Sequence, residues 1–375
     1  DAAGARLGVR VDINSPLVED GLADDARLEA HVGTLSELAD AGARLVLLAH
    51  QGRPGGDDFG CLSPHAGRLD DLLSAPVSYV DSTFSTAARE RIRDLEDGEV
   101  LVLENTRFFS EEYMEFPPAR AAESYLVACL APVLDAYVND AFAAAHRSQP
   151  SLVGFTEVLP SYAGRLMERE LDVLGRIDET GRPRVYFLAG AKVPDSLSVI
   201  ENVLDHDLAD EVLTGGLLGN VLLAARGVDL GEPSRRVMAE FDADAEVDRA
   251  AALLAAHGDH IVTPEDVAVE RDGRRHEVAV DELPVDAPAY DIGRRTIEAY
   301  EDRLSGAGTS ILNGPAGVTE NELFGEGTIG VYRAATGADT SIVGGGDTGA
   351  VLRTLGITGF DHVSTGGGAA MRMLA

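Results

Sequence analysis

The only lysine in this sequence, Lys192, follows an apolar run and precedes a stretch with helical spacing. Thirty arginines provide the other fixed cations, so a compact ammonium at this one point suits a phosphate oxygen at a helix N-terminus. The alternative is that Lys192 is a surface residue that remains by chance and has no function. The small neighbours Gly190 and Ala191 favour the phosphate, because they let a ligand approach the backbone.

A second candidate site is the run 341–349, Ser-Ile-Val-Gly-Gly-Gly-Asp-Thr-Gly, which predicts a strand, a glycine turn and a helix. Such a turn presents backbone N–H groups and the positive end of a helix to an anion. Asp347 directly follows the glycines, and its hard oxygen ligands suit a magnesium ion carried by a nucleotide. Its alternative role is to cap the helix. Further glycine clusters lie at 312–317 and 364–368.

Two common nucleotide motifs do not explain these glycines. The run 344–349 matches GxGxxG, but a dinucleotide site needs an acidic residue about 20 positions later, where Thr365 and Gly366 stand. Hydride transfer is therefore disfavoured. A Walker A loop is excluded, because its lysine follows glycine, whereas Lys192 follows Ala191.

The first half of the chain instead places basic side chains just after predicted strands. Several guanidinium groups at one sheet edge would clamp a phosphate and a carboxylate. Singly, each arginine could equally be a solvated surface charge. The residues concerned are Arg10 with Asp12, His50 with Arg53, Arg107, and His146 with Arg147.

Strand-like and helix-like segments alternate along the chain, which favours α/β units on parallel sheets. More than ten strands exceed one ordinary sheet, so we expect two domains. The seam is expected at 161–183, where an amphipathic helix ends in a polar run with Gly181 and Pro183. The predicted strands are 7–12, 44–49, 100–103, 137–139, 185–188, 211–213, 260–262, 310–312, 341–343 and 362–364.

These segments together resemble phosphoglycerate kinase over nearly the whole chain. The motifs RVDxNxP, HxGRP, LENxRF, NDAFxxAHR, GAKVxD, NGPxG, GGGDT and STGGGA occur in the order of that family. The resemblance implies reversible phosphoryl transfer between ATP and 3-phosphoglycerate, giving 1,3-bisphosphoglycerate and ADP. It also implies two Rossmann-like domains, each a mostly parallel sheet flanked by helices, joined by a hinge helix.

The resemblance assigns residues to each ligand. The acid substrate is held by Asp12, Asn14, His50, Arg53, Arg107 and Arg147, with Arg27 in a catalytic role. The nucleotide is bound by Gly190, Ala191, Lys192, Gly215, Gly216, Asn313, Gly314, Pro315, Glu320, Gly346, Asp347 and Thr348. Of these, Lys192 touches the transferring phosphoryl group, Asn313 the phosphates, Glu320 the ribose and Asp347 the Mg²⁺. The helix starting at Gly366, Gly367 and Gly368 aims its N-terminus at the same phosphoryl group.

The domain boundaries follow from the same resemblance. Residues 1–162 with 364–375 form the domain for 3-phosphoglycerate, 163–182 the hinge, and 183–363 the domain for the nucleotide. Water would compete for the phosphoryl group, so we expect the domains to close during transfer. Many family members carry a second lysine where this chain has Ser196, which concerns nucleotide affinity. We also expect that residues precede Asp1 and follow Ala375 in the whole protein.

Composition limits the remaining possibilities. The net charge of −33 is spread along the chain, which disfavours nucleic acid and anionic membranes as partners and suits a cytoplasm of concentrated salt. Two cysteines, 68 positions apart, indicate neither a disulfide framework nor a zinc site. We expect a cytoplasmic monomer. The alternatives are a kinase for another small carboxylate and a protein that only binds nucleotide or acts as a scaffold.

Overall fold

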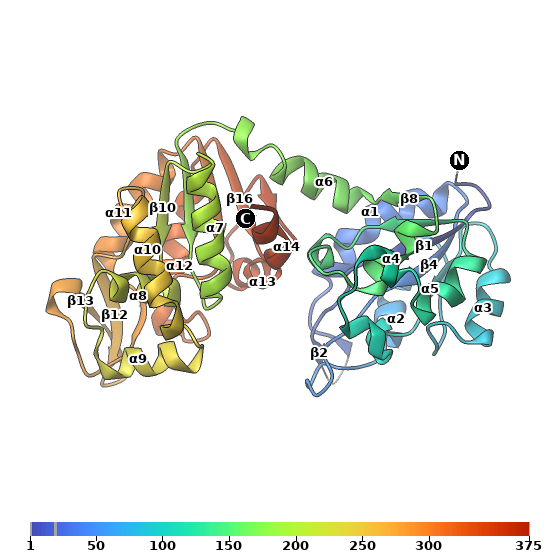
Figure 1. Ribbon diagram of the computed structural model, residues 1–375, viewed down its shortest axis with the longest axis horizontal. Coiled ribbons are helices and arrows are strands. Elements are labelled where there is room, and N and C mark those ends of the chain that lie inside the picture. Colours follow the sequence, from blue (N-terminus) through green and yellow to red (C-terminus); the bar gives the residue numbers. More distant parts are fainter. Residues whose placement is uncertain (1, 19–20, 375) are drawn as a thin grey trace. The chain divides into compact units, whose positions relative to one another are not determined.

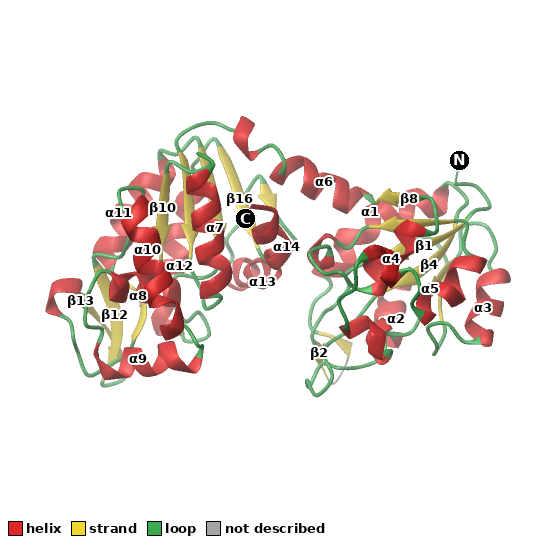
Figure 2. Ribbon diagram, viewed as in Figure 1, coloured by secondary structure: helices red, strands yellow, loops and turns green. Residues whose placement is uncertain are grey.

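The computed structural model describes residues 2–18 and 21–374, and for residues 346, 347 and 350 it describes the backbone alone. Contacts divide the chain into two compact units, Asp1–Asp172 (unit 1) and Val173–Ala375 (unit 2). Each unit is built on a six-stranded sheet with helices on its faces (Figures 1 and 2).

Unit 1 contains a parallel sheet of order β5-β6-β4-β1-β7-β8. Its strands are β1 Arg6–Arg10, β4 Arg44–Leu48, β5 Val77–Tyr79, β6 Val100–Val102, β7 Ala136–Asn139 and β8 Ser161–Ala163. Its helices are α1 Ala26–Asp40, α2 Ser63–Leu72, α3 Thr86–Arg93, α4 Pro118–Ala121 and α5 Tyr125–Leu130. A small hairpin joins β2 Leu17–Val18 to β3 Gly21–Leu22.

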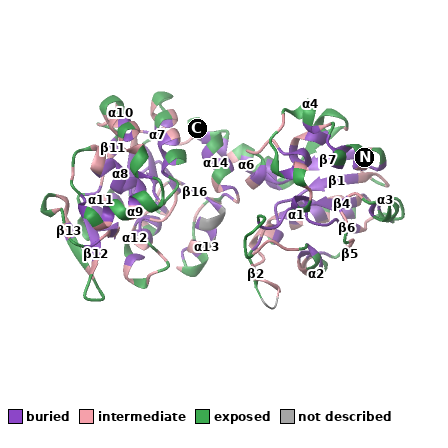
Figure 3. Ribbon diagram, turned by 60° about the horizontal axis from the view of Figure 1, so that its bottom comes forward, coloured by how far each residue is buried: buried purple, intermediate pink, exposed green. Residues whose placement is uncertain are grey.

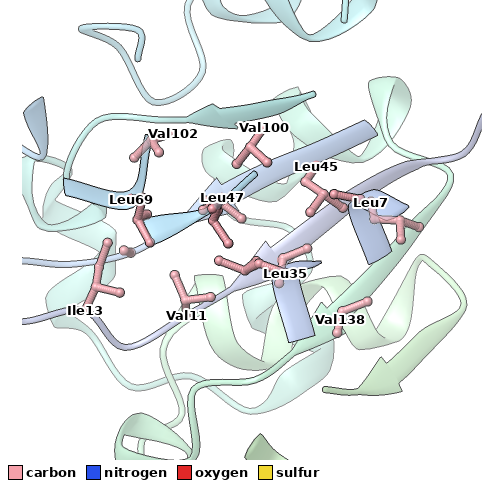
Figure 4. Packing of buried hydrophobic residues seen from close by; sticks show 14 of the residues in the cluster. Leu7, Val11, Ile13, Leu35, Leu45, Leu47, Leu69, Val100, Val102 and Val138 are labelled. Carbon is pink, nitrogen blue, oxygen red and sulfur yellow. The ribbon is translucent and has the colours of Figure 1, made fainter. Parts of the chain in front are cut away.

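Both faces of this sheet are covered, which explains why the central strands are almost continuously apolar. On one face, the strand residues Leu45 and Leu47 pack against Leu35 of α1 and Leu69 of α2 (Figure 4). On the other face, Val46 and Leu48 pack with residues of α3 and α5. Figure 3 accordingly shows β1 and β4 as buried.

Helix α6, Arg165–Leu174, carries the chain out of unit 1, and the boundary between the units falls within it. Its first turn is anchored in unit 1. The Thr34 hydroxyl of α1 accepts the Arg165 N–H at 2.9 Å. A carboxylate oxygen of Asp140 accepts the N–H groups of Leu166 and Met167. These contacts satisfy amide donors that a helix start otherwise leaves open.

Unit 2 contains a second parallel sheet, of order β11-β10-β9-β15-β16-β17. Its strands are β9 Arg184–Leu188, β10 Glu211–Thr214, β11 Ile261–Val262, β15 Thr309–Asn313, β16 Thr340–Gly344 and β17 His362–Val363. Its helices are α7 Val193–Asp205, α8 Gly216–Ala225, α9 Gly231–Glu240, α10 Val247–His257, α11 Arg294–Ser305, α12 Glu326–Ala335, α13 Gly346–Thr354 and α14 Gly367–Leu374.

A three-stranded antiparallel sheet, of order β13-β12-β14, extends unit 2. It comprises β12 Asp266–Arg271, β13 Arg274–Ala279 and β14 Ala289–Ile292. Asp272 and Gly273 form the two-residue turn between β12 and β13, and both have positive φ, 51° and 70°. An Asp-Gly pair is typical of such turns. This sheet was not predicted from the sequence, although the Asp-Gly pair is a signal for its hairpin.

The predicted fold class is confirmed, since two parallel sheets flanked by helices are present. All ten predicted strands are found within the two parallel sheets, with small shifts at their ends. The edge strands β5 and β8 were not predicted. Every residue of β8 is exposed, so no apolar pattern marked it.

We expected residues 364–375 to belong with the first domain, but the last helix packs within unit 2. Helix α14 packs against α7 and β16 of unit 2, and Leu374 accepts a hydrogen bond of 2.5 Å from the Asn202 side chain. The apolar face formed by Ala369, Ala370 and Met371 is buried there. Within residues 2–18 and 21–374, none of the helices combines the length and apolar character needed to cross a bilayer.

Candidate active site

The predicted acid-binding residues of unit 1 follow four neighbouring parallel strands. Asp12 and Asn14 follow β1, His50 and Arg53 follow β4, Arg107 follows β6, and Arg147 follows β7. The strands lie in the order β6-β4-β1-β7, so their carboxyl ends share one edge of the sheet. The loops also bond to one another, because the Asn14 side-chain oxygen accepts the Gly52 N–H at 2.7 Å.

Asp12 supplies a buried negative charge to this edge. Its carboxylate pairs with the Arg27 guanidinium at 2.7 Å, which brings α1 into the site. Burial alone would raise the pKa of Asp12, but the charges of Arg27 and Arg10 outweigh it and hold that pKa well below the ordinary range. Asp12 is therefore ionised at neutral pH, and it fixes the predicted catalytic Arg27 beside the other site residues.

Arg107 and Arg147 supply the excess positive charge. Arg107 donates to the Gly52 carbonyl at 2.6 Å and lies over the Tyr113 ring, 5.5 Å from its centre. Burial, with the nearby Arg147 charge, lowers the pKa of Arg107 to about 10. Burial also lowers the pKa of Arg147, and the charges of Arg10, Arg53 and Arg27 contribute to that shift. Cations that disfavour one another in this way attract an anion.

Two nitrogen atoms in this cluster lack a partner. Among the residues that the structure describes, the buried Arg107 Nε and Arg147 Nη1 have no hydrogen-bond acceptor. Buried donors without partners are uncommon and carry a free-energy cost. A bound phosphate or carboxylate oxygen would accept from both. Arg53, in contrast, is exposed.

A buried pair that the sequence analysis did not single out lies beneath Asp12. His31 of α1 and Asp140 after β7 form a hydrogen bond of 2.8 Å, and both are almost fully buried. The other ring nitrogen of His31 accepts the Asp12 N–H at 3.0 Å. The pair thus connects Asp12 to the first turn of α6. His31 occupies an ordinary inward position of an amphipathic helix, so its spacing carried no functional signal.

The predicted nucleotide residues of unit 2 also follow neighbouring strands. Gly190 to Lys192 follow β9, Gly215 and Gly216 follow β10, 313–315 end β15, and 346–348 follow β16. These strands are adjacent and parallel in the order β10-β9-β15-β16, with β17 next in the sheet. Gly366 to Gly368 follow β17, at the start of α14. The glycine turns therefore share one edge of the sheet.

Glycine is required here because the turns touch. The Gly216 N–H donates to the Ala316 carbonyl at 2.8 Å, and the Ala189 N–H donates to the Asn313 carbonyl at 2.9 Å. Gly314 has a φ of +81°, and a Cβ placed there would lie 2.7 Å from the carbonyl carbon of Ala189. The backbone consequently forms most of this surface, which suits a flat or extended ligand.

The remaining nucleotide residues surround these turns. Lys192 is exposed at the start of α7, and Glu320 is exposed on the loop after β15. Thr348 is buried in the first turn of α13. Gly346 and Asp347 belong to the same turn, and the structure describes only their backbone. Ser196, which stands where many family members have lysine, is buried in α7.

The two units thus define a class of protein. One carries a set of arginines for a small acidic molecule, and the other carries glycine turns at helix starts for phosphates. Together they are typical of a phosphotransferase that acts on a small acid.

Comparisons with known proteins identify the family. The family model for phosphoglycerate kinase matches residues 1–375. The chain is 61% identical over 376 residues to a phosphoglycerate kinase of Halobacterium salinarum, covering 100% of this chain and 94% of that relative. It is also 61% identical over 376 residues to one from Natronomonas pharaonis, with 100% and 95% covered.

Solved structures agree. The crystal structure of phosphoglycerate kinase from Pyrococcus horikoshii OT3 matches with a TM-score of 0.94 and 40% identity, covering 100% of this chain and 94% of that one. A structure of phosphoglycerate kinase from Coxiella burnetii matches with a TM-score of 0.79 and 29% identity, with the same coverage. The chain belongs to the phosphoglycerate kinase family. The predicted resemblance and class of enzyme are confirmed, and both curated relatives come from halophilic archaea, as the acidic composition suggested.

Proposed function

We propose that this chain binds 3-phosphoglycerate at the arginine-rich edge of unit 1, binds ATP at the glycine turns of unit 2, and transfers a phosphoryl group between them. The observation that carries the proposal is the pair of buried, unpartnered nitrogens, Arg107 Nε and Arg147 Nη1, beside Asp12 and Arg27. An anion with several oxygens would satisfy both.

The roles within unit 1 follow from charge and geometry. Arg53, Arg107 and Arg147 bind the acidic groups, with His50 and Asn14 completing the set. Asp12 holds Arg27 in place by their 2.7 Å pair. The Arg27 side chain remains about one quarter exposed, so its guanidinium group stays available to the oxygens of a transferring phosphoryl group.

The chemistry needs no general base. The attacking carboxylate is already ionised at neutral pH. What the protein must supply is alignment and neutralisation of the phosphoryl oxygens, through Arg27, Lys192 and the start of α14 at Gly366 to Gly368. Domain closure, which the sequence analysis expected, stays a prediction.

On the nucleotide side, Asn313 faces the phosphates and Glu320 the ribose, while Gly215, Gly216 and Gly314 let the base approach. Mg²⁺ would be held by the nucleotide phosphates and Asp347, and it would neutralise phosphate charge. Among the residues whose side chains are described, the structure contains no group of three or more His, Cys, Asp or Glu that could hold a metal ion.

We infer that the protein is a cytoplasmic monomer that takes small-molecule substrates. The acidic surface implied by the net charge of −33 supports the absence of nucleic acid and anionic membranes as partners.

Titration of the full-length protein tests these assignments. Replacing Arg53 with Gln should weaken 3-phosphoglycerate binding at least about tenfold and leave ADP binding within about twofold. Arg120→Gln is the matched control, because Arg120 is an exposed arginine of the same unit that forms an exposed ion pair with Glu123. Weaker ADP binding in Arg53→Gln, with unchanged 3-phosphoglycerate binding, would refute the assignment of unit 1.

A coupled assay tests the substrate. Turnover with 3-phosphoglycerate should greatly exceed turnover with acetate or aspartate as phosphoryl acceptor. Comparable rates would favour the alternative, a kinase for another small carboxylate.

A further inference from the structure

A continuous chain of buried hydrogen bonds leads from a carboxylate in the core of unit 1 to His50. Glu112, in the 3₁₀ helix Ser110–Tyr113, accepts from both the hydroxyl and the N–H of Ser151. The Ser151 hydroxyl oxygen accepts from Arg10 Nε at 2.9 Å. Arg10 Nη2 then bonds to His50 Nδ1 at 2.8 Å. Glu112, Ser151 and Arg10 are fully buried, and His50 is 3% exposed.

The direction of each bond follows from the chemistry of the groups. A guanidinium group can only donate, so His50 Nδ1 must accept. A neutral imidazole that accepts at Nδ1 carries its proton on Nε2. At the other end, Ser151 accepts from Arg10 and therefore has its own hydroxyl hydrogen free for Glu112. Every bond of the chain is thus satisfied in one arrangement only.

The arginines near His50 also favour the neutral ring. Arg10 of β1, Arg107 after β6 and Arg147 after β7 disfavour a second proton on the ring, whereas Asp12 favours one. Burial and these arginines lower the pKa of His50 well below its ordinary value. The Arg10 charge is itself partly balanced by Glu112, whose pKa burial raises while Arg10 opposes that rise.

We infer that Arg10, held in place by Ser151 and Glu112, is a positioning residue that keeps His50 neutral and makes it present Nε2–H to the acid substrate. This inference rests on the proposed function, in which His50 binds 3-phosphoglycerate. His50 then acts as a directed hydrogen-bond donor to one substrate oxygen, while the arginines supply the charge. A fixed tautomer also removes the need to reorient the ring when substrate arrives.

Variants of Arg10 separate this role from mere packing. Arg10→Gln removes the charge and the donor to His50 Nδ1 but keeps a donor for Ser151, because its amide nitrogen reaches only as far as Arg10 Nε. Arg10→Met removes the charge and both donors. Ser151→Ala leaves Arg10 present and cuts its link to Glu112, so it covers the case in which Arg10→Met fails to fold. The matched control is Tyr137→Phe, which removes a different buried hydrogen bond, from the tyrosine hydroxyl to the Ser151 carbonyl at 2.8 Å.

The first measurement is ¹⁵N NMR of the histidine ring nitrogens in the full-length protein, with His50 assigned from a His50→Gln spectrum. We expect the Nε2–H tautomer of His50 in the parent and in Tyr137→Phe. In Arg10→Gln and Arg10→Met we expect a mixture of tautomers and an upward shift of the His50 pKa. Ser151→Ala should show a smaller change in the same direction.

The second measurement is the KM for each substrate. We expect Arg10→Met and Arg10→Gln each to raise the KM for 3-phosphoglycerate about tenfold, and neither to change the KM for ATP more than about twofold. The phosphate of the substrate titrates near pH 6. The ratio of variant to parent KM is therefore compared at each pH between 5.5 and 8, which cancels that titration.

The outcomes distinguish this inference from the proposed function. If the parent does not phosphorylate 3-phosphoglycerate, the proposed function fails. If the parent is active but His50 carries its proton on Nδ1, the inference is overturned. It is also overturned if Arg10→Met and Ser151→Ala both keep the parent tautomer and the parent KM.

Discussion

The two units prepare the carboxyl ends of their parallel strands for anions by different means. In unit 1 the strand ends carry charged side chains, and a buried network that includes Glu112, Ser151, His31 and Asp140 holds them. In unit 2 the strand ends carry glycine turns whose backbones bond to one another. Side-chain charges select a small acid by the placement of each group, whereas backbone amides at helix starts suit the repeated phosphates of a nucleotide.

Both kinds of site lie within a strongly acidic chain, and the largest effect we expect concerns this shared charge. At about 1 M salt the screening length is about 3 Å, but it reaches about 30 Å at 10 mM. Dilution to about 10 mM salt should therefore unfold both units, because their carboxylates repel one another. Circular dichroism against temperature at several salt concentrations measures this. Full thermal stability at about 10 mM salt would contradict this prediction. Unfolding of one unit alone would show that the two units also differ in how their stability depends on salt.

The next largest effect concerns Lys192, a side-chain cation at the backbone-lined site. Lys192→Ala should lower kcat about 10²- to 10³-fold, with little change in the KM for 3-phosphoglycerate, because its charge matters most during transfer. Steady-state kinetics with both substrates measures this. Arg236→Ala, an exposed cation on α9 of the same unit, is the control for loss of one positive charge. Turnover within about threefold of the parent, less than about 1 kcal/mol of barrier, would remove Lys192 from the mechanism.

A glycine pair tests whether unit 2 depends on backbone contact. Gly314 and Gly273 have similar positive φ values, +81° and +70°, but a Cβ at Gly273 would meet nothing within 4 Å. Gly273→Ala should cost about 1 kcal/mol of unfolding free energy, from backbone strain alone. Gly314→Ala should cost about 3 kcal/mol and also weaken nucleotide binding, because the turn must move away from Ala189. Urea unfolding and ADP titration measure the two effects, and equal losses would contradict the idea of touching turns.

The sequence predicted the two sites unequally, for a physical reason. Short motifs at strand ends, such as those containing Arg53 and Gly314, predicted which residues reach each sheet edge, because strand and turn signals are local. The residues that hold unit 1 together were not predicted. Glu112 and Ser151 are 39 positions apart and lie in short irregular helices, so no spacing related them to Arg10. Their partnership exists only in the tertiary structure.

The smallest effect we expect comes from this buried network, through Asp140. Burial would raise the pKa of Asp140, but the hydrogen bond from His31 outweighs it, and the pKa is lowered. Its ionised form thus contributes stability that is complete above its unfolded pKa of about 3.9 and is lost as the pH falls through the folded value. Asp140→Asn should lower the unfolding free energy by about 2 kcal/mol at pH 7, because the amide cannot accept from His31 as the carboxylate does.

This loss should shrink as the pH falls below about 4, since the parent then loses the same interaction. Circular dichroism in urea at constant high salt measures the unfolding free energy of the parent and of Asp140→Asn. Asp12 titrates equally in both proteins, so its contribution to the difference cancels. Asp97→Asn is the control, because Asp97 forms a mostly exposed pair with Arg44 and should cost less than about 1 kcal/mol. A difference between Asp140→Asn and the parent that stays constant from pH 7 to pH 3 would mean that Asp140 acts through shape alone. In unit 1, charged side chains would then matter only at the residues that face the substrate.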